Sequence, residues 1–515
     1  MVQTMVHSHP QRDILPAGSS ASDWCTHPET LQAFWPFAGN TTGIAAAIAA
    51  RGSVDLKRRK HTADCILGQY AKAGMSPPQA LIEFAEGAEV VSVGHQLQAG
   101  GGPAFFHYKI LSALRWAAQL RASGTPAVAV FWMASEDHDF EEIAQTHGPG
   151  GPTFEWTPER LDEAPVGRIT WDADAENAWQ AWCQSVSQST GTVDDIPMPL
   201  AHRVRHWLEE WFGQENLLVI DGDDAELKAS ARGILEPEWS GDGIADALRS
   251  AHAAYASKWS SVPLNVQANN LFVLEENGRR TRADRWLAAH SAADVQQLRP
   301  EQWSPNAALR PVYQEYVLQS AAFVGGPSEV GYWLMLAGAF RHHGVAHPAL
   351  LVRDGAFVHN AHSIRAAEAC GWTPQQPALT GDAAVAAWAD NLLRGNGELD
   401  RAFEAWSEAL IAHAEGVPGD AVPTTRAALT KMEKELLHVR KKWRKLVRQQ
   451  RAEEAESMRT AVEDWMCPRG QGQERQLSAL PLMETVGGGT AFIEKWYKAL
   501  EGANEPQFLV FHPDS

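Results

Sequence analysis

Two apolar runs frame a glycine-bearing loop and an amphipathic stretch between residues 90 and 133. The runs Val90–Val93 and Ala127–Met133 are rich in β-branched and aromatic residues, which predicts two buried strands. Residues 94–102 predict a loop, Pro103 suits the first turn of a helix, and apolar side chains then follow at helical spacing: Phe106, Ile110, Leu111, Leu114, Ala117, Ala118 and Leu120. Strand, loop, helix and strand form a βαβ unit, which predicts a parallel sheet with a right-handed crossover.

The alternation of strands and helices continues through the middle of the chain. The stretch "NLLVIDGDDAELK" predicts a strand that ends at Asp221 and Asp223 and is followed by a helix. "NNLFVLEENGRRTR" predicts a hairpin with its turn at Asn277-Gly278. "GYWLMLAGAFRHHG" predicts an amphipathic helix, and "HPALLVRD" predicts a further strand. The fold class is therefore predicted to be α/β.

The pattern changes after residue 381. From Thr424 onward apolar residues alternate by three and four, which predicts a coiled-coil seam: Leu429, Met432, Leu436, Val439, Trp443 and Leu446. The helical stretch 382–415 precedes a Pro418-Gly419 break and is expected to fold back as its partner. We therefore expect four parts: a mainly helical segment 1–85 packed on the core, an α/β core 86–381, a coiled-coil hairpin 382–464, and a segment 465–515 that returns to the core.

Composition and charge narrow the function classes. The 515 residues are 44% hydrophobic and 21% charged, which is typical of a globular protein. The sequence has no apolar run of the roughly 18–20 residues that a membrane span needs, and its start lacks a signal-peptide core, so we expect a cytoplasmic protein. The five cysteines are scattered and form no CxxC pair, which favours reduced thiols over a zinc site.

A net charge of −19 argues against wholesale binding to nucleic acid. One segment is basic although the chain as a whole is acidic: residues 431–451 hold nine Lys or Arg and only two Glu. Two interpretations stay open for this basic arm. It is either a solvated helix face, or a surface that binds phosphate, nucleotide or RNA.

The strand Ala127–Met133 leads into four ionisable residues, Glu136, Asp137, His138 and Asp139. One interpretation is a solvated turn that caps the next helix. The other is an active-site edge, because open parallel sheets bind ligands at the carboxyl ends of their strands. In that case His138 is a candidate general base or a ligand for a divalent ion. The chain lacks an HExxH zinc pair, so we assign no metal-ligating residues, and the participation of a metal stays open.

Two further stretches supply candidate binding residues. The loop after the first strand offers backbone N–H groups to an anion, with a lysine two turns into the following helix: Gly94, His95, Gln96, Gly101, Gly102, Pro103 and Lys109. It lacks a Walker ending and the GxGxxG spacing. Residues 303–333 place polar groups in an apolar context, which is more typical of a ligand pocket than of a core: Asn306, Arg310, Gln314, Gly326, Pro327, Glu329 and Tyr332.

These segments, taken in order, resemble the BshC family of bacillithiol biosynthesis. The resemblance covers about residues 90–475 and is carried by "GHQ…GGP…K", "FWMASEDHDFEE", "NNLFVL…GRR", "SPNAALRPVYQE", "FVGGPSEVGYW" and "PRGQGQER". The acidic motif and "VGGPSE" are its most specific parts. At one position the chain departs from the family loop "GQQ", because it has His95 there.

The resemblance implies a fold, a reaction and partners. It implies a Rossmann-like core with two connecting insertions, laid out as in class I aminoacyl-tRNA synthetases, plus an antiparallel coiled coil, in a homodimer. The implied reaction joins the carboxyl group of cysteine to the amino group of glucosaminyl-malate, which completes bacillithiol. A site for ATP or ADP near the coiled coil is also implied, while the energy source of the ligation is left unassigned. Neither a membrane nor a nucleic acid is an expected partner.

The resemblance also assigns roles to the candidate residues. One of Glu136, Asp137 and Asp139 would hold an ammonium group, and His138 would take a proton from the attacking amine. The Gly100–Pro103 loop and Lys109 would steady a phosphate or carboxylate. Four residues would clamp an anion or a nucleotide: Arg310, Arg353, Gln473 and Arg475.

Two other functions remain open from the residues. One is a synthetase-like protein that activates an amino acid or binds RNA, which the basic arm favours and the lack of a KMSKS-type segment disfavours. The other is a non-catalytic assembly protein that acts through its coiled coil. The ionisable residues clustered at strand ends disfavour the second, since a scaffold gains nothing from them.

Overall fold

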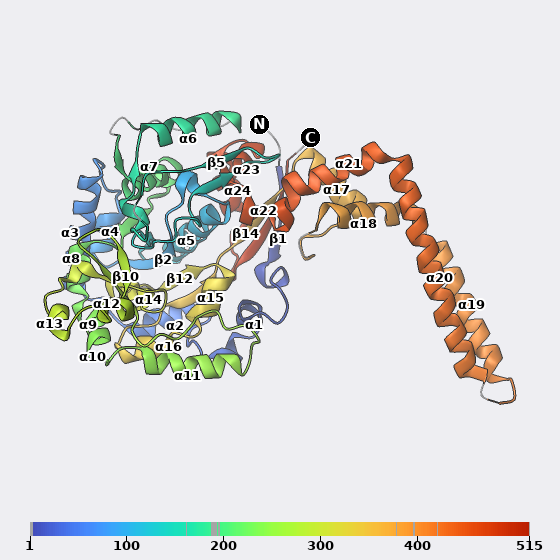
Figure 1. The fold of residues 1–515 in the computed structure, drawn as a ribbon, viewed down its shortest axis with the longest axis horizontal. Coiled ribbons are helices and arrows are strands. Elements are labelled where there is room, and N and C mark those ends of the chain that lie inside the picture. The colour runs from blue at the N-terminus through green and yellow to red at the C-terminus, as the bar shows by residue number, and fades with distance from the viewer. Residues whose placement is uncertain are drawn as a thin grey trace. The chain divides into compact units, whose positions relative to one another are not determined.

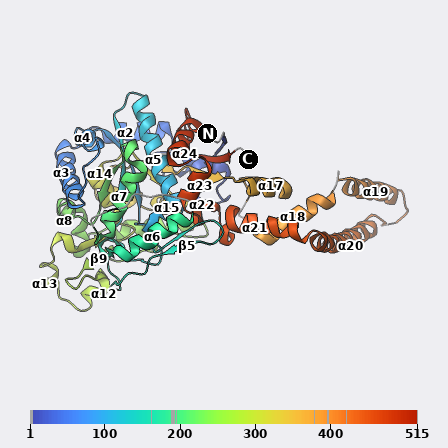
Figure 2. The ribbon, with the colours of Figure 1, turned by 90° about the horizontal axis from the view of Figure 1, so that it is seen from above.

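The computed structural model describes residues 4–513 except 161, 187–192, 194–195, 377–378, 395–396 and 420. The chain forms two compact units. The first comprises residues up to Val358 together with Glu474–Phe511, and the second comprises His359–Gln473 and the last residues of the chain. Figures 1 and 2 show the chain in two views.

The first unit is built on a five-stranded parallel sheet. Its strands lie in the order β13-β12-β2-β3-β8, and all four strand pairs are parallel. When the five strands are numbered along the chain and the sheet is read from β8 to β13, their order is 3-2-1-4-5. This is the Rossmann order, which confirms the expected Rossmann-like core. The strands are β2 (Glu89–His95), β3 (Ala127–Met133), β8 (Leu218–Asp221), β12 (Ala322–Gly325) and β13 (Ala349–Val352).

Helices cover both faces of this sheet. Phe131 and Trp132 are neighbours on β3, so their side chains point to opposite faces. The Phe131 ring packs against Phe106 of α5 (Phe105–Ala122), and the Trp132 ring packs against Tyr313 of α14 (Arg310–Leu318). The helices α5 and α14 therefore lie on opposite faces, as right-handed crossovers that leave the sheet centre in opposite directions require. The strand residues of β3 are all buried, which fits a sheet covered on both sides.

Smaller sheets flank the central one. β9 (Leu271–Leu274) pairs with both β10 (Arg280–Arg282) and β11 (Trp303–Pro305), and the predicted Asn277-Gly278 turn joins β9 to β10, with Gly278 at φ +89°. Another sheet has the order β1-β15-β14, with bounds Thr4–Pro10, Gln507–Pro513 and Gly355–Val358. Two short pairs are β4 with β5 and β6 with β7, at Gln145–His147, Thr153–Glu155, Thr170–Trp171 and Met198–Pro199.

The remaining α-helices of this unit complete its layers. The segment 1–85 contributes four of them, and it also contains strand β1, which the sequence pattern did not predict. Their bounds are α1 Ser20–Thr26, α2 Thr41–Arg51, α3 Leu56–Lys72, α4 Ala80–Ala85, α6 Ala173–Ser185, α7 Leu200–Phe212, α8 Ala225–Ser230, α9 Arg232–Leu235, α10 Pro237–Ser240, α11 Ala245–Ala256, α12 Ala283–Leu287, α13 Ala292–Val295, α15 Pro327–Trp333, α16 Ala337–His342, α22 Gln473–Gln476, α23 Ala479–Thr485 and α24 Gly489–Ala499.

The second unit is helical and contains the coiled-coil hairpin. The helices α19 (Glu398–Glu415) and α20 (Ala421–Gln450) run side by side in both views, and α17 (Ala361–Cys370), α18 (Gly381–Arg394) and α21 (Ala452–Ala461) complete the unit (Figures 1 and 2). The predicted seam is buried at Leu429, whereas Met432, Val439, Trp443 and Leu446 are exposed.

Some cations of the basic arm are ion-paired within the second unit. Arg440 pairs with Asp400 of α19, and Arg444 pairs with Asp390 of α18. These pairs hold part of the basic face of α20 against its neighbours. None of the helices that the structure describes is long and apolar enough to cross a membrane.

Candidate active site

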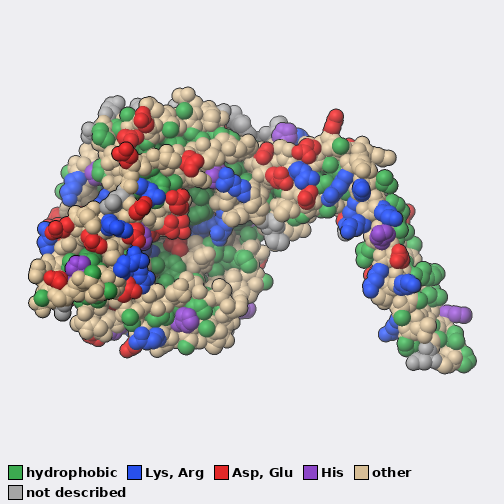
Figure 3. All heavy atoms as spheres, viewed as in Figure 1, with side chains coloured by type: hydrophobic (Ala, Val, Ile, Leu, Met, Phe, Trp, Pro, Cys, Tyr) green, Lys and Arg blue, Asp and Glu red, His purple; other side chains and the backbone are tan. Residues whose placement is uncertain are grey.

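A cavity of about 640 Å³ opens at the carboxyl edge of the parallel sheet. Strands β2 and β12 are neighbours there, and the chain leaves them in opposite directions. Such a switch point is where open α/β sheets bind ligands. Residues at or just after the ends of β2, β3, β12 and β13 line the cavity, as do residues of the β9–β10–β11 sheet and of the loop before it. Figure 3 shows the hollow, with acidic and basic side chains around it.

Most of the residues predicted for the site meet at this cavity. Those that line it are His95, Gln96, Lys109, Glu136, Asp137, His138, Asn306, Arg310, Gly326, Pro327, Glu329, Tyr332, Arg353 and Arg475. In the part of the chain that the structure describes, seven others do not line it: Gly94, Gly101, Gly102, Pro103, Asp139, Gln314 and Gln473.

Glu136 is the most buried member of the acidic cluster, with 2% of its surface exposed. Its Oε2 accepts a hydrogen bond of 2.9 Å from Ser304 Oγ and lies 3.1 Å from Lys228 Nζ. Its Oε1 is buried and has no hydrogen-bond partner among the described residues. Burial raises the pKa of Glu136, while the ammonium group of Lys228 opposes that rise. The free oxygen is therefore an acceptor that a ligand can satisfy.

Asp137 is held by donors on several sides. Gln96 Nε2 donates to Oδ2 at 2.6 Å, the His138 backbone N–H donates to Oδ1 at 2.7 Å, and Arg280 Nη1 lies 3.6 Å from Oδ1. Burial would raise the pKa of Asp137, but contacts with His138, Arg280 and Gln96 outweigh it and hold that pKa well below its usual range. Asp137 is therefore a fixed anion. Asp139 is exposed and lies outside the cavity.

Arg280 is a site residue that the sequence did not single out. It begins β10, its side chain is 5% exposed, and its guanidinium stacks 3.9 Å above the ring of Phe272. Its Nη1 lies 2.9 Å from His138 Nδ1. The "GRR" motif beside the hairpin turn contributed to the family resemblance, but charge next to a turn is usually solvated, so the motif did not predict a site role for Arg280.

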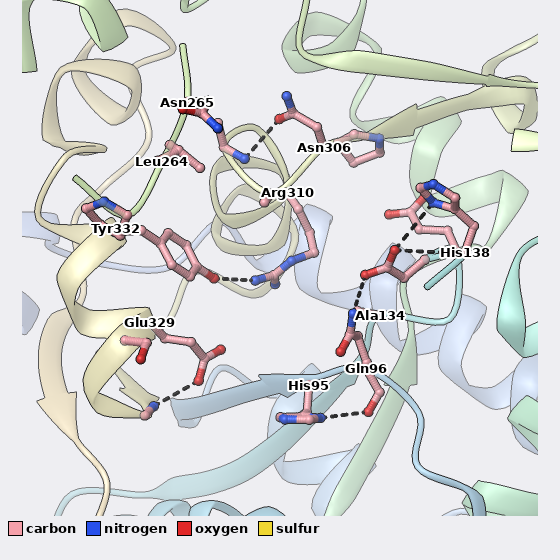
Figure 4. A pocket seen from close by; sticks show the side chains of 18 of the residues that line it. His95, Gln96, Ala134, His138, Leu264, Asn265, Asn306, Arg310, Glu329 and Tyr332 are labelled. Atoms are coloured by element: carbon pink, nitrogen blue, oxygen red, sulfur yellow. Dashed lines mark hydrogen bonds and ion pairs between the residues drawn. The ribbon is translucent and has the colours of Figure 1, made fainter. Parts of the chain in front are cut away.

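A basic side chain without a carboxylate partner occupies another part of the cavity wall. Arg310 donates to Gln314 Oε1 at 2.8 Å and to the Tyr332 hydroxyl at 3.0 Å, and within the described ranges no carboxylate lies at ion-pair distance (Figure 4). Both partners are neutral. The guanidinium charge is therefore available to an anionic group of a ligand.

Lys109, in contrast, is already paired. Its Nζ donates to the Gly94 carbonyl at 2.7 Å and forms an ion pair with Glu329. Burial lowers the pKa of Lys109, and Glu329 partly restores it. Burial and the nearby Lys109 lower the pKa of His95 to about 4, so this ring is neutral at neutral pH. His95 Nδ1 then donates to the Gln96 carbonyl at 2.9 Å.

The glycine loop is packed rather than open. A Cβ on Gly101 would lie 2.6 Å from Trp211 Cη2, and one on Gly102 would lie 2.4 Å from Gln98 Oε1. Pro103 forms a β-bridge with Ser478. The loop therefore supports the end of β2 from within the protein, and its backbone does not reach the cavity. This placement differs from the expected anion cradle.

Two of the predicted clamp residues are also engaged elsewhere. Arg353 lines the cavity, but its guanidinium makes two hydrogen bonds to the Glu474 carboxylate, at 2.9 and 2.5 Å. Gln473 donates to the Trp465 carbonyl at 3.0 Å inside the second unit. Arg475 is exposed and lines the cavity.

Several lining residues come from irregular backbone between α11 and β9, where periodicity gives no signal. This segment supplies Pro263, Leu264, Asn265, Gln267 and Asn269, and further unpredicted lining residues include Phe105, Phe272, Arg280 and Arg282. A search for three or more His, Cys, Asp or Glu side chains arranged around a metal finds none among the described residues.

Family models and relatives of known name match this chain. Residues 16–354 match the model of the N-terminal Rossmann-like domain of BshC from bacillithiol biosynthesis, and residues 392–512 match the model of its C-terminal coiled-coil domain. A relative from Cytophaga hutchinsonii, named "Putative cysteine ligase BshC", is 27% identical over 504 residues, which cover 93% of this chain and 94% of the relative. Relatives of the same name from Flavobacterium johnsoniae and Staphylococcus saprophyticus are 30% and 26% identical and cover 52% of this chain, with 54% and 56% of their own lengths matched.

Proposed function

The chain belongs to the BshC family of bacillithiol biosynthesis, and on that premise we propose that it is a ligase that adds cysteine to glucosaminyl-malate. The new bond joins the carboxyl carbon of cysteine to the amino nitrogen of the glucosamine ring. One carboxyl oxygen leaves with the activating group, and the amine loses a proton. The cavity at the sheet edge is the proposed site of this reaction.

One observation carries the proposal. The cavity wall includes Glu136, whose buried Oε1 has no donor among the described residues, and Arg310, whose guanidinium has no carboxylate partner there. A ligand with an ammonium group and a carboxylate satisfies both. Each of the two proposed substrates has both groups, because cysteine is an amino acid and glucosaminyl-malate combines an amino sugar with a dicarboxylate. We therefore propose that Glu136 holds an ammonium group and that Arg310 holds a carboxylate.

The residues predicted for a nucleotide do not fit an open phosphate site. The glycine loop is filled by Trp211 and Gln98, Arg353 is occupied by Glu474, and Gln473 donates to a backbone carbonyl. Arg475 alone among the predicted clamp residues is both exposed and on the cavity wall. The assay decides whether ATP supplies the energy of the ligation.

The test is a direct assay on the purified full chain. Glucosaminyl-malate and cysteine are incubated with the protein, with and without ATP and magnesium, and the product is followed by mass spectrometry. We expect the mass of the cysteinyl conjugate. Product that requires ATP identifies a ligase that activates the carboxyl group itself, and product without ATP shows that ATP is not the energy source of the ligation. No product from folded protein under any of these conditions would overturn the proposal.

Matched variants connect the activity to the cavity. Glu136→Gln keeps the size of the side chain but removes the charge, and Arg310→Met removes the guanidinium and keeps much of the apolar stem. Each is expected to raise KM at least tenfold, because each removes a charge-assisted contact worth about 1.5–3 kcal/mol. Arg299→Met is the control, since Arg299 is exposed and lies outside the cavity.

A further inference from the structure

The contact between Arg280 and His138 restricts what this histidine can do. Arg280 is fixed from several directions: its Nε donates to Ser304 Oγ at 2.9 Å, its Nη2 donates to the Pro305 carbonyl at 3.0 Å, and its plane stacks on Phe272. The guanidinium is therefore held in one orientation. In that orientation Nη1 lies 2.9 Å from His138 Nδ1.

The proton balance of this contact follows from the chemistry of the two groups. A guanidinium carries five N–H donors and no acceptor, and it stays protonated in proteins. A hydrogen bond at 2.9 Å therefore requires Nδ1 of His138 to be the acceptor. The ring must then be neutral, with its single proton on Nε2.

The competing arrangement has Nδ1–H donating to Asp137. Asp137 Oδ1 lies 3.5 Å from His138 Nδ1, which is beyond an ordinary hydrogen bond, and the same oxygen already accepts the His138 backbone N–H at 2.7 Å. The 2.9 Å contact with Arg280 is the shorter of the two, and a protonated Nδ1 would face a donor there. We therefore favour the acceptor state.

We infer that His138 is a neutral N–H donor to a substrate oxygen, and that Arg280 is the positioning residue that fixes this tautomer. The Nδ1 edge of the ring faces buried Arg280. About a third of the side chain is exposed, and His138 lines the cavity (Figure 4). The exposed edge carries Nε2–H. Its natural partner is a carboxylate or carbonyl oxygen of the acyl substrate, and this inference rests on the proposed function.

This arrangement removes His138 as the base that receives the proton of the attacking amine. Nε2 is already protonated, and Nδ1 is covered by Arg280. Among the cluster residues, Glu136 retains a carboxylate oxygen without a donor on the cavity wall in the described part of the chain. The proton acceptor and the oxygen donor of the site are therefore two different side chains.

The direct test reads the tautomer and needs no activity. The full chain is labelled with ¹⁵N-histidine, and the His138 signals are assigned by their loss in His138→Asn. We expect an unprotonated Nδ1 and a protonated Nε2 at neutral pH, with this preference lost in Arg280→Leu and largely kept in Arg280→Gln, whose amide still donates. A protonated Nδ1 in the unmodified protein would overturn the inference, whether or not the proposed ligase activity is found.

The kinetics of two His138 variants distinguish a hydrogen-bond donor from a general base. His138→Gln keeps an N–H donor and has no basic nitrogen, whereas His138→Ala has neither. A donor role predicts that His138→Gln stays within about tenfold of the unmodified kcat while His138→Ala loses on the order of 100-fold, and a base role predicts equal losses. Equal losses would overturn the inference. His61→Ala, on the exposed surface of α3, is the control for handling and folding.

Discussion

Gln96 Nε2 donates a hydrogen bond of 2.6 Å to Asp137 Oδ2, and this bond joins the ends of two neighbouring strands of the parallel sheet. Gln96 directly follows β2, and Asp137 lies four residues beyond β3. The bond fixes the carboxylate where the chain turns away from the sheet. Asp137 thereby becomes a rigid anion that orients its neighbours His138 and Arg280.

The unfolding free energy should depend on pH through the ionisation of Asp137. Its folded pKa is lowered below the unfolded value of about 3.9, so its contribution to the unfolding free energy is fully present above that value. The contribution is lost as pH falls through the unfolded pKa toward the folded one. In urea denaturation followed by tryptophan fluorescence, we expect the unfolding free energy of the unmodified chain to exceed that of Asp137→Asn by about 1–3 kcal/mol at pH 7. Near pH 3 the difference should be roughly a third to a half smaller.

Asp64→Asn is the matched control for this experiment. Asp64 is exposed on α3, and it forms no ion pair within the described residues. Its substitution should leave the unfolding free energy within about 0.5 kcal/mol at either pH. An Asp137→Asn difference that stays constant between pH 7 and pH 3 would contradict the assignment of Asp137 as a stabilising anion.

The ion pair of Lys109 and Glu329 should be costly to break from one side. The Lys109 side chain is 2% exposed, so Lys109→Met leaves the Glu329 carboxylate without its cation. We expect a loss of about 3–5 kcal/mol in unfolding free energy. The double variant Lys109→Met, Glu329→Gln should recover a large part of that loss, because it removes the unpaired charge.

Chemical denaturation of the four proteins of this double-mutant cycle makes the measurement, with Lys60→Met, an exposed lysine on α3, as the control. The control should change stability by no more than about 0.5 kcal/mol. Additive losses in the double variant would show that the two side chains do not stabilise each other.

The central sheet was largely predictable, because its strands are continuous apolar runs. Ala127–Met133 was predicted with the bounds that the structure has, and Val90–Val93 lies inside β2. β1 was not predictable, since "TMVHSHP" has no apolar period and becomes a strand through pairing with β15. Local pattern thus identified four of the five strands of the central sheet. It missed β12, although the residues of that strand are buried, and it missed β1, which is defined by a distant partner.

The site shows the same division. The residues at strand ends were found, because parallel strands bring their carboxyl ends to one edge. The contact of Arg280 with His138 spans 142 positions in the sequence and depends on how the β9–β10 hairpin meets that edge. The heptad pattern likewise found α20, but Met432, Val439, Trp443 and Leu446 of the predicted seam remain exposed.

The glycine loop provides a test that separates a structural role from a binding role. Gly101 and Gly124 have similar φ angles, +81° and +87°, so alanine at either position is strained by about 1–2 kcal/mol. At Gly101 the new Cβ would also meet Trp211, whereas at Gly124 no heavy atom lies within 4 Å. We expect Gly101→Ala to be the less stable variant by a further 1–3 kcal/mol or so.

Substrate kinetics complete that comparison. If the loop supports the sheet from within, folded Gly101→Ala keeps the KM of the unmodified protein for both substrates. Equal stability of the two alanine variants, or a KM raised tenfold in Gly101→Ala alone, would contradict the supporting role and favour a role of the loop in binding substrate.

We propose that the protein forms a homodimer through α19 and α20, because the hairpin exposes several large apolar residues. Trp406 is 44% exposed, Trp443 40% and Leu446 54%, on helices whose other exposed positions are mostly polar. We propose that a partner covers these exposed apolar side chains. A second copy of the hairpin is the proposed partner, because its heptad residues repeat the same spacing. We expect a dimer in sedimentation equilibrium at micromolar concentration and a shift toward monomer in Trp443→Glu. Gln449→Glu changes charge equally at an exposed polar position of α20 and should remain a dimer. A monomeric unmodified chain, or a Trp443→Glu variant that stays dimeric, would reject the hairpin as the interface.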